Sequence, residues 1–259
     1  MKFLSVLILV LLVITLSAYS QEVMKPLKWV VRPSFGLTFP IKQLSGGHIT
    51  DQLVGFGGVT YYGQFISTTY FFNRWGIEFS FAGNYSSKLD GRHDRFIAEV
   101  EKKYSGNYFV SPSSGGIYLP SNIVGGAIGK GSLGPVYKVE KNRFVLIGRA
   151  MIGSTSFDTD WGSASLKGKG TNELINIDWK AGKSFKEYFT FNPSFTLGYR
   201  LFDRVVLDFD LNYWIYNIDF EYWETIENMH TKAISTQHYA YSNLINEFGV
   251  GFGLMIVLK

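Results

Sequence analysis

The stretch Lys186 to Phe220, KEYFTFNPSFTLGYRLFDRVVLDFDLNYWIYNIDF, alternates between apolar and polar side chains. In its first arm the apolar positions are Phe189, Phe191, Pro193, Phe195, Leu197, Tyr199 and Leu201. The positions between them are Thr190, Asn192, Ser194, Thr196, Gly198 and Arg200. In its second arm the apolar positions are Val205, Leu207, Phe209, Leu211, Tyr213 and Ile215. Because successive strand side chains point to opposite faces, the pattern predicts two strands joined by a tight turn at Asp203-Arg204.

Each arm is longer than the roughly 5–6 residues usual for a soluble strand and suits the roughly 9–11 tilted residues that cross a bilayer. The polar face carries Arg200, Asp208 and Asp210. A soluble β-sandwich can show the same alternation, but its solvent-facing side usually holds more Lys and Glu. We therefore interpret the hairpin as two neighbouring strands of a transmembrane β-barrel.

The same two-residue rhythm recurs along the chain. It predicts further strands at Trp29–Phe39, Val54–Phe72, Trp75–Tyr85, within Ile123–Val139, at Arg143–Ser156 and at Leu244–Lys259. A short helix from Asp94 to Lys103 and strand extensions near Leu174–Trp179 are expected in the connections.

The connections alternate between short and long. The short turns are Asn73-Arg74, Glu140–Asn142 and Asp203-Arg204, and the long loops are 40–52, 86–121, 157–185 and 225–242. Bacterial outer-membrane barrels have short turns on the periplasmic side and long loops outside. Four long and three short connections predict an all-β fold, an eight-stranded antiparallel transmembrane up-and-down β-barrel.

Composition supports one β domain and excludes several other classes. The 259 residues include 28 Gly, 22 Phe and 16 Tyr, and only 18% of residues are charged. The net charge of +4 comes from no block of Lys or Arg, so we expect no nucleic-acid partner. The absence of Cys excludes disulfides, thiolate metal sites, a cysteine nucleophile and a lipid anchor on an N-terminal cysteine.

Residues 1–20, MKFLSVLILVLLVITLSAYS, have the form of a secretory signal peptide. Lys2 is followed by an apolar run from Phe3 to Leu16 and by the small-x-small pattern Ala18-Tyr19-Ser20. The alternative is an uncleaved anchor, but the run is shorter than the roughly 20 residues that a spanning helix needs. The expected organisation is a signal peptide at 1–20 and an outer-membrane β-barrel domain at 21–259.

The segments NRWGIEFSFAGNY (73–85), TFNPSFTLGYRLF (190–202) and FGVGFGLMIVL (248–258) resemble the small outer-membrane β-barrel family, the group of outer membrane proteins A, W and X. The resemblance covers roughly residues 27–259. It implies a monomer in the cell outer membrane, with outer-membrane lipid, lipopolysaccharide and the barrel-assembly machinery as partners. One departure is that the family's last strand commonly ends in an aromatic residue, whereas this chain ends in Leu258-Lys259.

If the apolar faces meet lipid, the opposite faces meet in a lumen that side chains just fill. The charged residues predicted to point inward are Arg32, Glu78, Arg149, Arg200, Asp208 and Asp210. Charges away from water must be paired, so we expect a salt-bridged plug. The alternative is an ion path gated by the same pairs.

Aromatic rings are expected to mark both bilayer interfaces. The belt at the short-turn side would hold Trp29, Phe72, Trp75, Phe144 and Phe202, and the outer belt Tyr85, Phe189 and Tyr213.

The histidines His48, His93, His230 and His238 all fall in predicted outer loops. His93-Asp94 with Ser111, Ser113 or Ser114 could imitate a hydrolase or acyltransferase site, but no G-x-S-x-G motif is present. His230 and His238 are at best a weak metal pair, and GGAIGKG (125–131) lacks the Ser or Thr of a phosphate loop. We therefore predict no catalytic, cofactor or metal site.

Three functional hypotheses follow from these patterns. The first is a non-enzymatic outer-membrane protein with a structural, adhesive or loop-binding role. The second is a narrow, porin-like channel for small solutes or apolar ligands, and the third is a lipid-modifying enzyme at the rim.

Overall fold

The computed structural model describes residues 27–41, 59–71, 73–85, 92–110, 128–158, 162–181 and 185–258. Its strands are β1 (Trp29–Pro40), β2 (Thr60–Tyr70), β3 (Trp75–Tyr85), β4 (Tyr108–Phe109), β5 (Ile128–Lys141), β6 (Phe144–Asp158), β7 (Gly162–Gly168), β8 (Leu174–Ala181), β9 (Phe185–Phe202), β10 (Val205–Asn228) and β11 (Ile234–Val257). One helix, α2 (Arg92–Tyr104), lies between β3 and β4.

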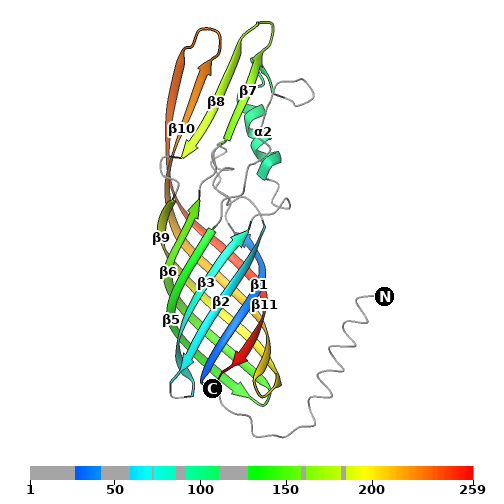
Figure 1. Ribbon diagram of the computed structural model, residues 1–259, viewed down its shortest axis with the longest axis vertical. Coiled ribbons are helices and arrows are strands. Elements are labelled where there is room, and N and C mark those ends of the chain that lie inside the picture. The colour runs from blue at the N-terminus through cyan, green and yellow to red at the C-terminus, as the bar shows by residue number, and fades with distance from the viewer. Residues whose placement is uncertain are drawn as a thin grey trace, which may run out of the picture.

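Eight of these strands close into an antiparallel barrel (Figure 1). Their order around the wall is β1-β2-β3-β5-β6-β9-β10-β11, and β11 pairs with β1 to complete the ring. The predicted eight-stranded up-and-down β-barrel is therefore confirmed. Closure leaves no unpaired strand edge in the wall, which is the condition for backbone to cross hydrocarbon.

Short turns join the strands at one end of the barrel, called here the short-turn end. Asn73 and Asn142 take positive φ angles of 63° and 56° in two of these turns. Asn tolerates this left-handed conformation better than most residues, which explains why the tight reversals fall where the sequence predicts them.

The outer surface of the barrel is apolar and the inner surface is polar. Phe35, Phe189 and Phe202 point outward and are 71%, 70% and 71% exposed. On β1, the exposed Phe35 directly follows Ser34, which is buried on the inner face together with Arg32. An apolar surface that covers a whole barrel wall far exceeds the few hundred Å² that soluble monomers expose, so hydrocarbon is the solvent that fits it.

Beyond the barrel, on the side away from the short turns, β10 and β11 continue as a long hairpin (Figure 1). β8 adds to β10, β7 to β8 and β4 to β7, and α2 lies against this sheet. We call this unit, made of α2, β4, β7, β8 and residues 217–244 of β10 and β11, the distal module. The prediction of a loop at 225–242 is wrong, because these residues are mostly strand and reverse only between Asn228 and Ile234.

Most other elements lie close to their predicted limits. β3 matches Trp75–Tyr85, and α2 is three residues longer than the predicted helix. The fourth barrel strand, predicted within Ile123–Val139, is β5, and the predicted loop 157–185 holds β7 as well as the expected extension, β8.

Some predictions fall outside the described residues. They concern the signal peptide at 1–20, residues 54–58 and 123–127, His48, Phe72, Ser111, Ser113, Ser114 and Lys259, and the side chains of Tyr85 and His93. Among the described helices none is long and apolar enough to cross a bilayer.

Candidate functional site: the barrel lumen and the distal module

The middle of the lumen is organised around Arg32 of β1. Its side chain is 2% exposed, and Nη1 lies 2.8 Å from Asp210 Oδ1 and 3.3 Å from Asp208 Oδ1 on β10. Because β11 separates β1 from β10 in the wall, these bonds cross the inner face of β11. A buried guanidinium is tolerated here because two carboxylates face it.

Thr196 of β9 joins this group to a second arginine. Its hydroxyl accepts hydrogen bonds from Arg32 Nη1 at 2.8 Å and Arg149 Nη1 at 2.5 Å, and it donates to Asp210. Arg149 Nε lies 2.6 Å from Oε1 of Glu78, which is on β3. One hydroxyl therefore connects charges from β1, β6 and β10, and Arg149 extends the network to β3.

A second layer of charges lies toward the short-turn end. Arg200 Nη2 lies 2.8 Å from Glu140 Oε2, and Lys138 Nζ lies 2.5 Å from Glu140 Oε1. Lys138 also donates to the carbonyl of Leu27 at 2.6 Å and sits 4.3 Å from the centre of the Tyr70 ring. The lead-in to β1 is thus bound to this end of the lumen.

A third layer lies toward the distal module. Lys130 of β5 pairs with Glu247 of β11, and its ammonium lies 4.1 Å from the centre of the Trp214 ring. Tyr216 donates to Glu247 Oε1 at 2.6 Å. Tyr62 packs edge-on against Trp214 at 5.5 Å, so large rings close the space around the ion pair.

All six charges predicted to face the lumen are buried. Besides the contacts given above, Thr68 donates a hydrogen bond to Glu78 Oε2 at 2.7 Å, and Arg149 Nη1 lies 3.6 Å from Asp210 Oδ1. Four further lumen charges, Lys130, Lys138, Glu140 and Glu247, were not predicted. Together the described lumen holds five cations, Arg32, Lys130, Lys138, Arg149 and Arg200, and five anions, Glu78, Glu140, Asp208, Asp210 and Glu247. The charges therefore cancel.

Alternation could have assigned Glu247 to the inner face, because it is one residue before Phe248 in the last strand. The alternation does not show that Lys130 faces inward, because the glycines around it interrupt the pattern of β5. The glycines of β11 also have a role in the lumen. A side chain at Gly251 would overlap the Tyr62 hydroxyl, and one at Gly249 would overlap the Trp214 ring.

The predicted belt residues lie on the outer surface wherever the structure describes them. Trp29, Trp75, Phe144 and Phe202 are exposed at strand ends on the short-turn side of the barrel. Phe189 is exposed toward the other end of β9, and Tyr213 is partly exposed. Their role as interface anchors stays a prediction.

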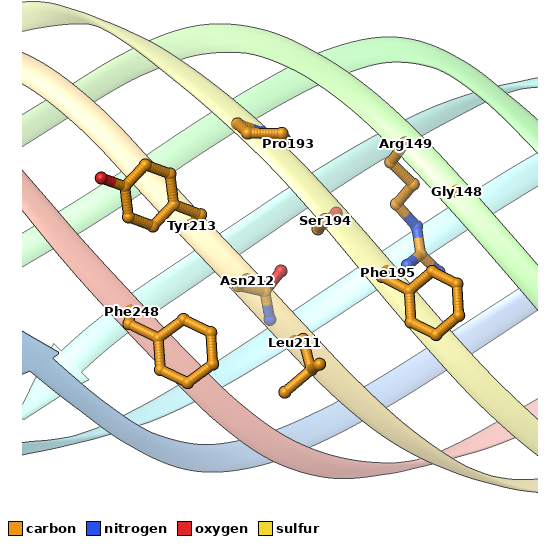
Figure 2. Close-up of a pocket in the computed structure, with 9 residues that line it drawn as sticks. All are labelled: Gly148, Arg149, Pro193, Ser194, Phe195, Leu211, Asn212, Tyr213 and Phe248. Atoms are coloured by element: carbon orange, nitrogen blue, oxygen red, sulfur yellow. The ribbon is translucent and has the colours of Figure 1, made fainter.

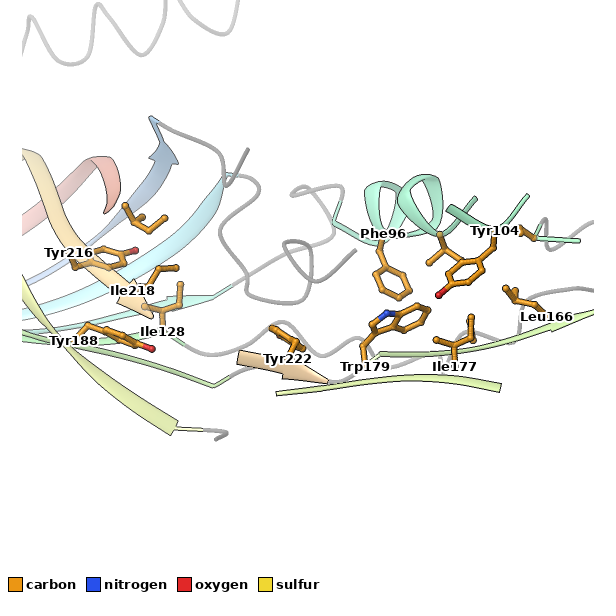
Figure 3. Close-up of a cluster of buried hydrophobic side chains, with 14 of the residues drawn as sticks. Phe96, Tyr104, Ile128, Leu166, Ile177, Trp179, Tyr188, Tyr216, Ile218 and Tyr222 are labelled. Carbon is orange, nitrogen blue, oxygen red and sulfur yellow. The ribbon is translucent and has the colours of Figure 1, made fainter. Parts of the chain in front are cut away.

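The distal module has its own core. Phe96 of α2 packs edge-on against Trp179 of β8, with ring centres 5.4 Å apart. The cluster continues through Tyr222 to Tyr216 and Ile218 at the mouth of the barrel (Figure 3). The module is therefore packed onto the barrel as well as connected to it by strands.

A buried carboxylate ties α2 to the sheet. Glu224 of β10, 2% exposed, accepts Lys103 Nζ at 2.7 and 2.8 Å and Trp179 Nε1 at 2.7 Å. Burial, and then the nearby Glu224 carboxylate, raise the pKa of Tyr104 above its ordinary value. A carboxylate with three hydrogen bonds, two of them from a cation, is a strong local constraint on the helix.

The two histidines whose side chains the structure describes, His230 and His238, each have local contacts. His230 lies 2.6 Å from the carbonyl of Asn172, and His238 stacks on Trp223 and lies 3.6 Å from Glu221. No group of three or more metal-ligating residues occurs in the part of the chain that the structure describes.

No protein-family description and no curated protein sequence matches this chain. Several solved structures are similar in outline, including these three. A major outer membrane protein of Thermus thermophilus is 10% identical with a TM-score of 0.43, and the match covers 88% of this chain and 99% of that protein. Ail, the attachment invasion locus protein of Yersinia pestis, is 10% identical with a TM-score of 0.38 (90% and 100% covered). The outer membrane protease OmpT of Escherichia coli is 8% identical with a TM-score of 0.36 (93% and 100% covered).

At such identities and scores these likenesses carry no argument about activity. The assignment rests on the chain's own strand pairing, its apolar exterior and its segregated short turns. The fold is that of the small outer-membrane β-barrels.

Proposed function

We propose that this protein is a non-enzymatic outer-membrane barrel that anchors the distal module outside the cell, where the module binds other molecules or surfaces. The observation that carries the proposal is the continuity of β10 and β11. Each is 24 residues long, about twice the roughly 9–11 residues that the bilayer requires, and each passes unbroken from the wall into the module. A strand pair of that length holds the module rigidly away from the membrane.

The proposed location is the cell outer membrane, reached by export with a cleaved signal peptide at residues 1–20 and insertion by the barrel-assembly machinery. The short turns would face the periplasm and the module the exterior, in contact with lipid and lipopolysaccharide around the wall. The chain would act as a monomer, with residues 21–259 as one barrel domain.

The lumen supports an anchor better than a channel. Its three layers of paired charges and rings occupy the short-turn end, the middle and the distal end in turn. Opening a path would require breaking ion pairs in each layer, and removing one partner of a buried pair costs about 3–5 kcal/mol. Passage of small solutes is therefore the second candidate, and it requires these pairs to rearrange.

Surface binding by whole cells tests the role of the module. A trimmed variant of the protein lacks the distal module. In this variant Asn217 is joined to its pairing partner Leu244 through a short turn, and residues 92–110 and 162–181 are replaced with Gly/Ser linkers. Bacteria that display the intact protein should adhere to surfaces coated with extracellular-matrix proteins or host-cell glycans, and bacteria that display the trimmed barrel should not.

The barrel of the trimmed variant must still fold, and its retained heat-modifiable gel mobility would show this. As a matched control, Thr225→Ser changes a partly exposed module residue and should leave adhesion intact. Equal adhesion by intact and trimmed proteins, or adhesion by neither on any of these surfaces, would contradict the proposal.

A further inference from the structure

The outer wall of the barrel contains a hollow of about 360 Å³ that crosses β6, β9, β10 and β11 (Figure 2). Its lining residues are Gly148, Arg149, Pro193, Ser194, Phe195, Leu211, Asn212, Tyr213 and Phe248. Arg149 and Asn212 are buried on the lumen side, whereas Gly148 and Phe195 are exposed on the outside. The hollow therefore opens on the face that meets hydrocarbon.

The hollow exists because small residues are set among large ones. Gly148 pairs with Phe195, which pairs with Leu211, so a position without a side chain lies beside two bulky ones. A Cβ added at Gly148 would meet nothing within 4 Å. The Tyr213 and Phe248 side chains flank the other side, as the close-up shows (Figure 2).

Pro193 interrupts the wall at the same place. The β9–β10 ladder runs to the Ser194–Asn212 pair, omits the position where Pro193 would face Tyr213, and resumes at the Phe191–Ile215 pair. Proline has no N–H for a ladder and is rare inside a sheet. The Asn192 side chain supplies the missing donor, with Nδ2 3.2 Å from the Tyr213 carbonyl.

The hydrogen bond between Asn192 and the Tyr213 carbonyl affects which ligands the hollow can hold. An unpaired carbonyl facing hydrocarbon would be strongly destabilising and would require a polar partner. Because Asn192 satisfies the Tyr213 carbonyl from within the wall, the hollow presents mainly rings and aliphatic groups to the outside. Its volume is at the lower end of the roughly 300–1,000 Å³ range of ligand pockets.

We propose that this hollow binds one acyl chain of a membrane phospholipid. It is continuous with the apolar face that surrounds the barrel, so hydrocarbon is the material that reaches it. Gly148 is five residues into β6 and Phe195 is seven residues before the end of β9, both counted from the short-turn end. That depth suits a chain entering from the leaflet on the short-turn side, which the proposed location makes the phospholipid leaflet.

A flexible acyl chain gains little binding energy on a flat part of the wall, because it contacts protein on one side only. In the hollow a chain touches protein on several sides, and the many weak dispersion contacts add up. The bound chain also covers the point where the ladder is interrupted. We therefore expect one lipid to be retained when the other lipids around the barrel exchange.

Native mass spectrometry of the full chain in detergent, titrated with phosphatidylethanolamine, tests this inference. Gly148→Leu places an aliphatic side chain at the hollow, and its Cβ would meet nothing within 4 Å. Gly83→Leu is the matched control, since Gly83 is also an exposed wall glycine whose added Cβ would meet nothing within 4 Å. The wild type and Gly83→Leu should form a one-lipid complex at low lipid concentration, and Gly148→Leu should need at least about tenfold more lipid.

The inference fails if the wild type shows no preferred one-lipid complex, if Gly148→Leu binds as the wild type does, or if Gly83→Leu is weakened equally. It rests on the proposed membrane location, and the two failures are distinguishable. A wrong location would appear as a mature chain that stays soluble and monomeric without detergent, before any lipid is added.

Discussion

Replacing Thr196 with Val tests whether the middle of the lumen is a single connected network. The hydroxyl of Thr196 accepts from Arg32 and Arg149 and donates to Asp210, whereas Val has nearly the same shape and no hydroxyl. Hydrogen bonds to charged groups contribute about 1.5–3 kcal/mol each. Both arginines keep carboxylate partners, so the full sum is not lost. We expect a loss of about 2–4 kcal/mol in the free energy of unfolding.

The assay is equilibrium unfolding by urea from phospholipid vesicles. Thr196→Ser keeps the hydroxyl and should lose only about 1 kcal/mol for the missing methyl group. Thr190→Val removes a neutral hydroxyl pair with Thr155, at 2.6 Å, and should cost no more than about 1.5 kcal/mol. If Thr196→Val lies within about 1 kcal/mol of the wild type, or if Thr190→Val costs as much as Thr196→Val, the network argument is refuted.

Three other predictions concern single contacts. Asp210→Asn should lower the free energy of unfolding by about 3–5 kcal/mol in the same urea assay, because two buried arginines, Arg32 and Arg149, lose a negative charge beside them. An unchanged midpoint of the urea unfolding curve would contradict the ion pairs of Asp210 with these arginines. Glu224→Gln should speed hydrogen exchange in α2 and leave exchange in β1–β3 unchanged, since it removes the charge that pairs with Lys103 of α2 and weakens the hydrogen bond from Trp179 of β8; uniform exchange rates would argue against a separate module core. The raised folded pKa of Tyr104 means that its contribution to stability is complete below its ordinary pKa of about 10 and is lost as pH rises toward the folded pKa. The module should therefore loosen in strong alkali, and Tyr104→Phe should remove that part of the pH dependence measured by hydrogen exchange.

The barrel could be predicted from sequence because its wall separates two environments. Along β9, hydrocarbon on one side and a polar lumen on the other force Phe191 and Phe195 to alternate with Asn192 and Thr196. That alternation ends where the wall leaves the membrane, although the strand does not. Residues 234–240 of β11 are exposed on both faces, apart from the partly buried Tyr239, so their side chains follow no two-residue rhythm. This is why a strand was mistaken for a loop.

The lumen was predicted in part for a related reason. Whether a side chain faces the lumen follows from its place in the two-residue alternation of its own strand. Arg32 and Asp208 could therefore each be assigned to the lumen individually. Which charges meet depends on the register of strands far apart in the sequence, such as Lys130 and Glu247, 117 residues apart. The hollow at Gly148 was not predictable either, because it is formed by residues of four strands that only the closed barrel brings together.

Planar-bilayer recording tests the closed lumen most directly. The full mature protein, reconstituted at single-molecule density, should give no steady single-channel current at neutral pH, because ion pairs and rings occupy each described layer of the lumen. A reproducible steady conductance from the folded barrel would contradict the account and favour a channel.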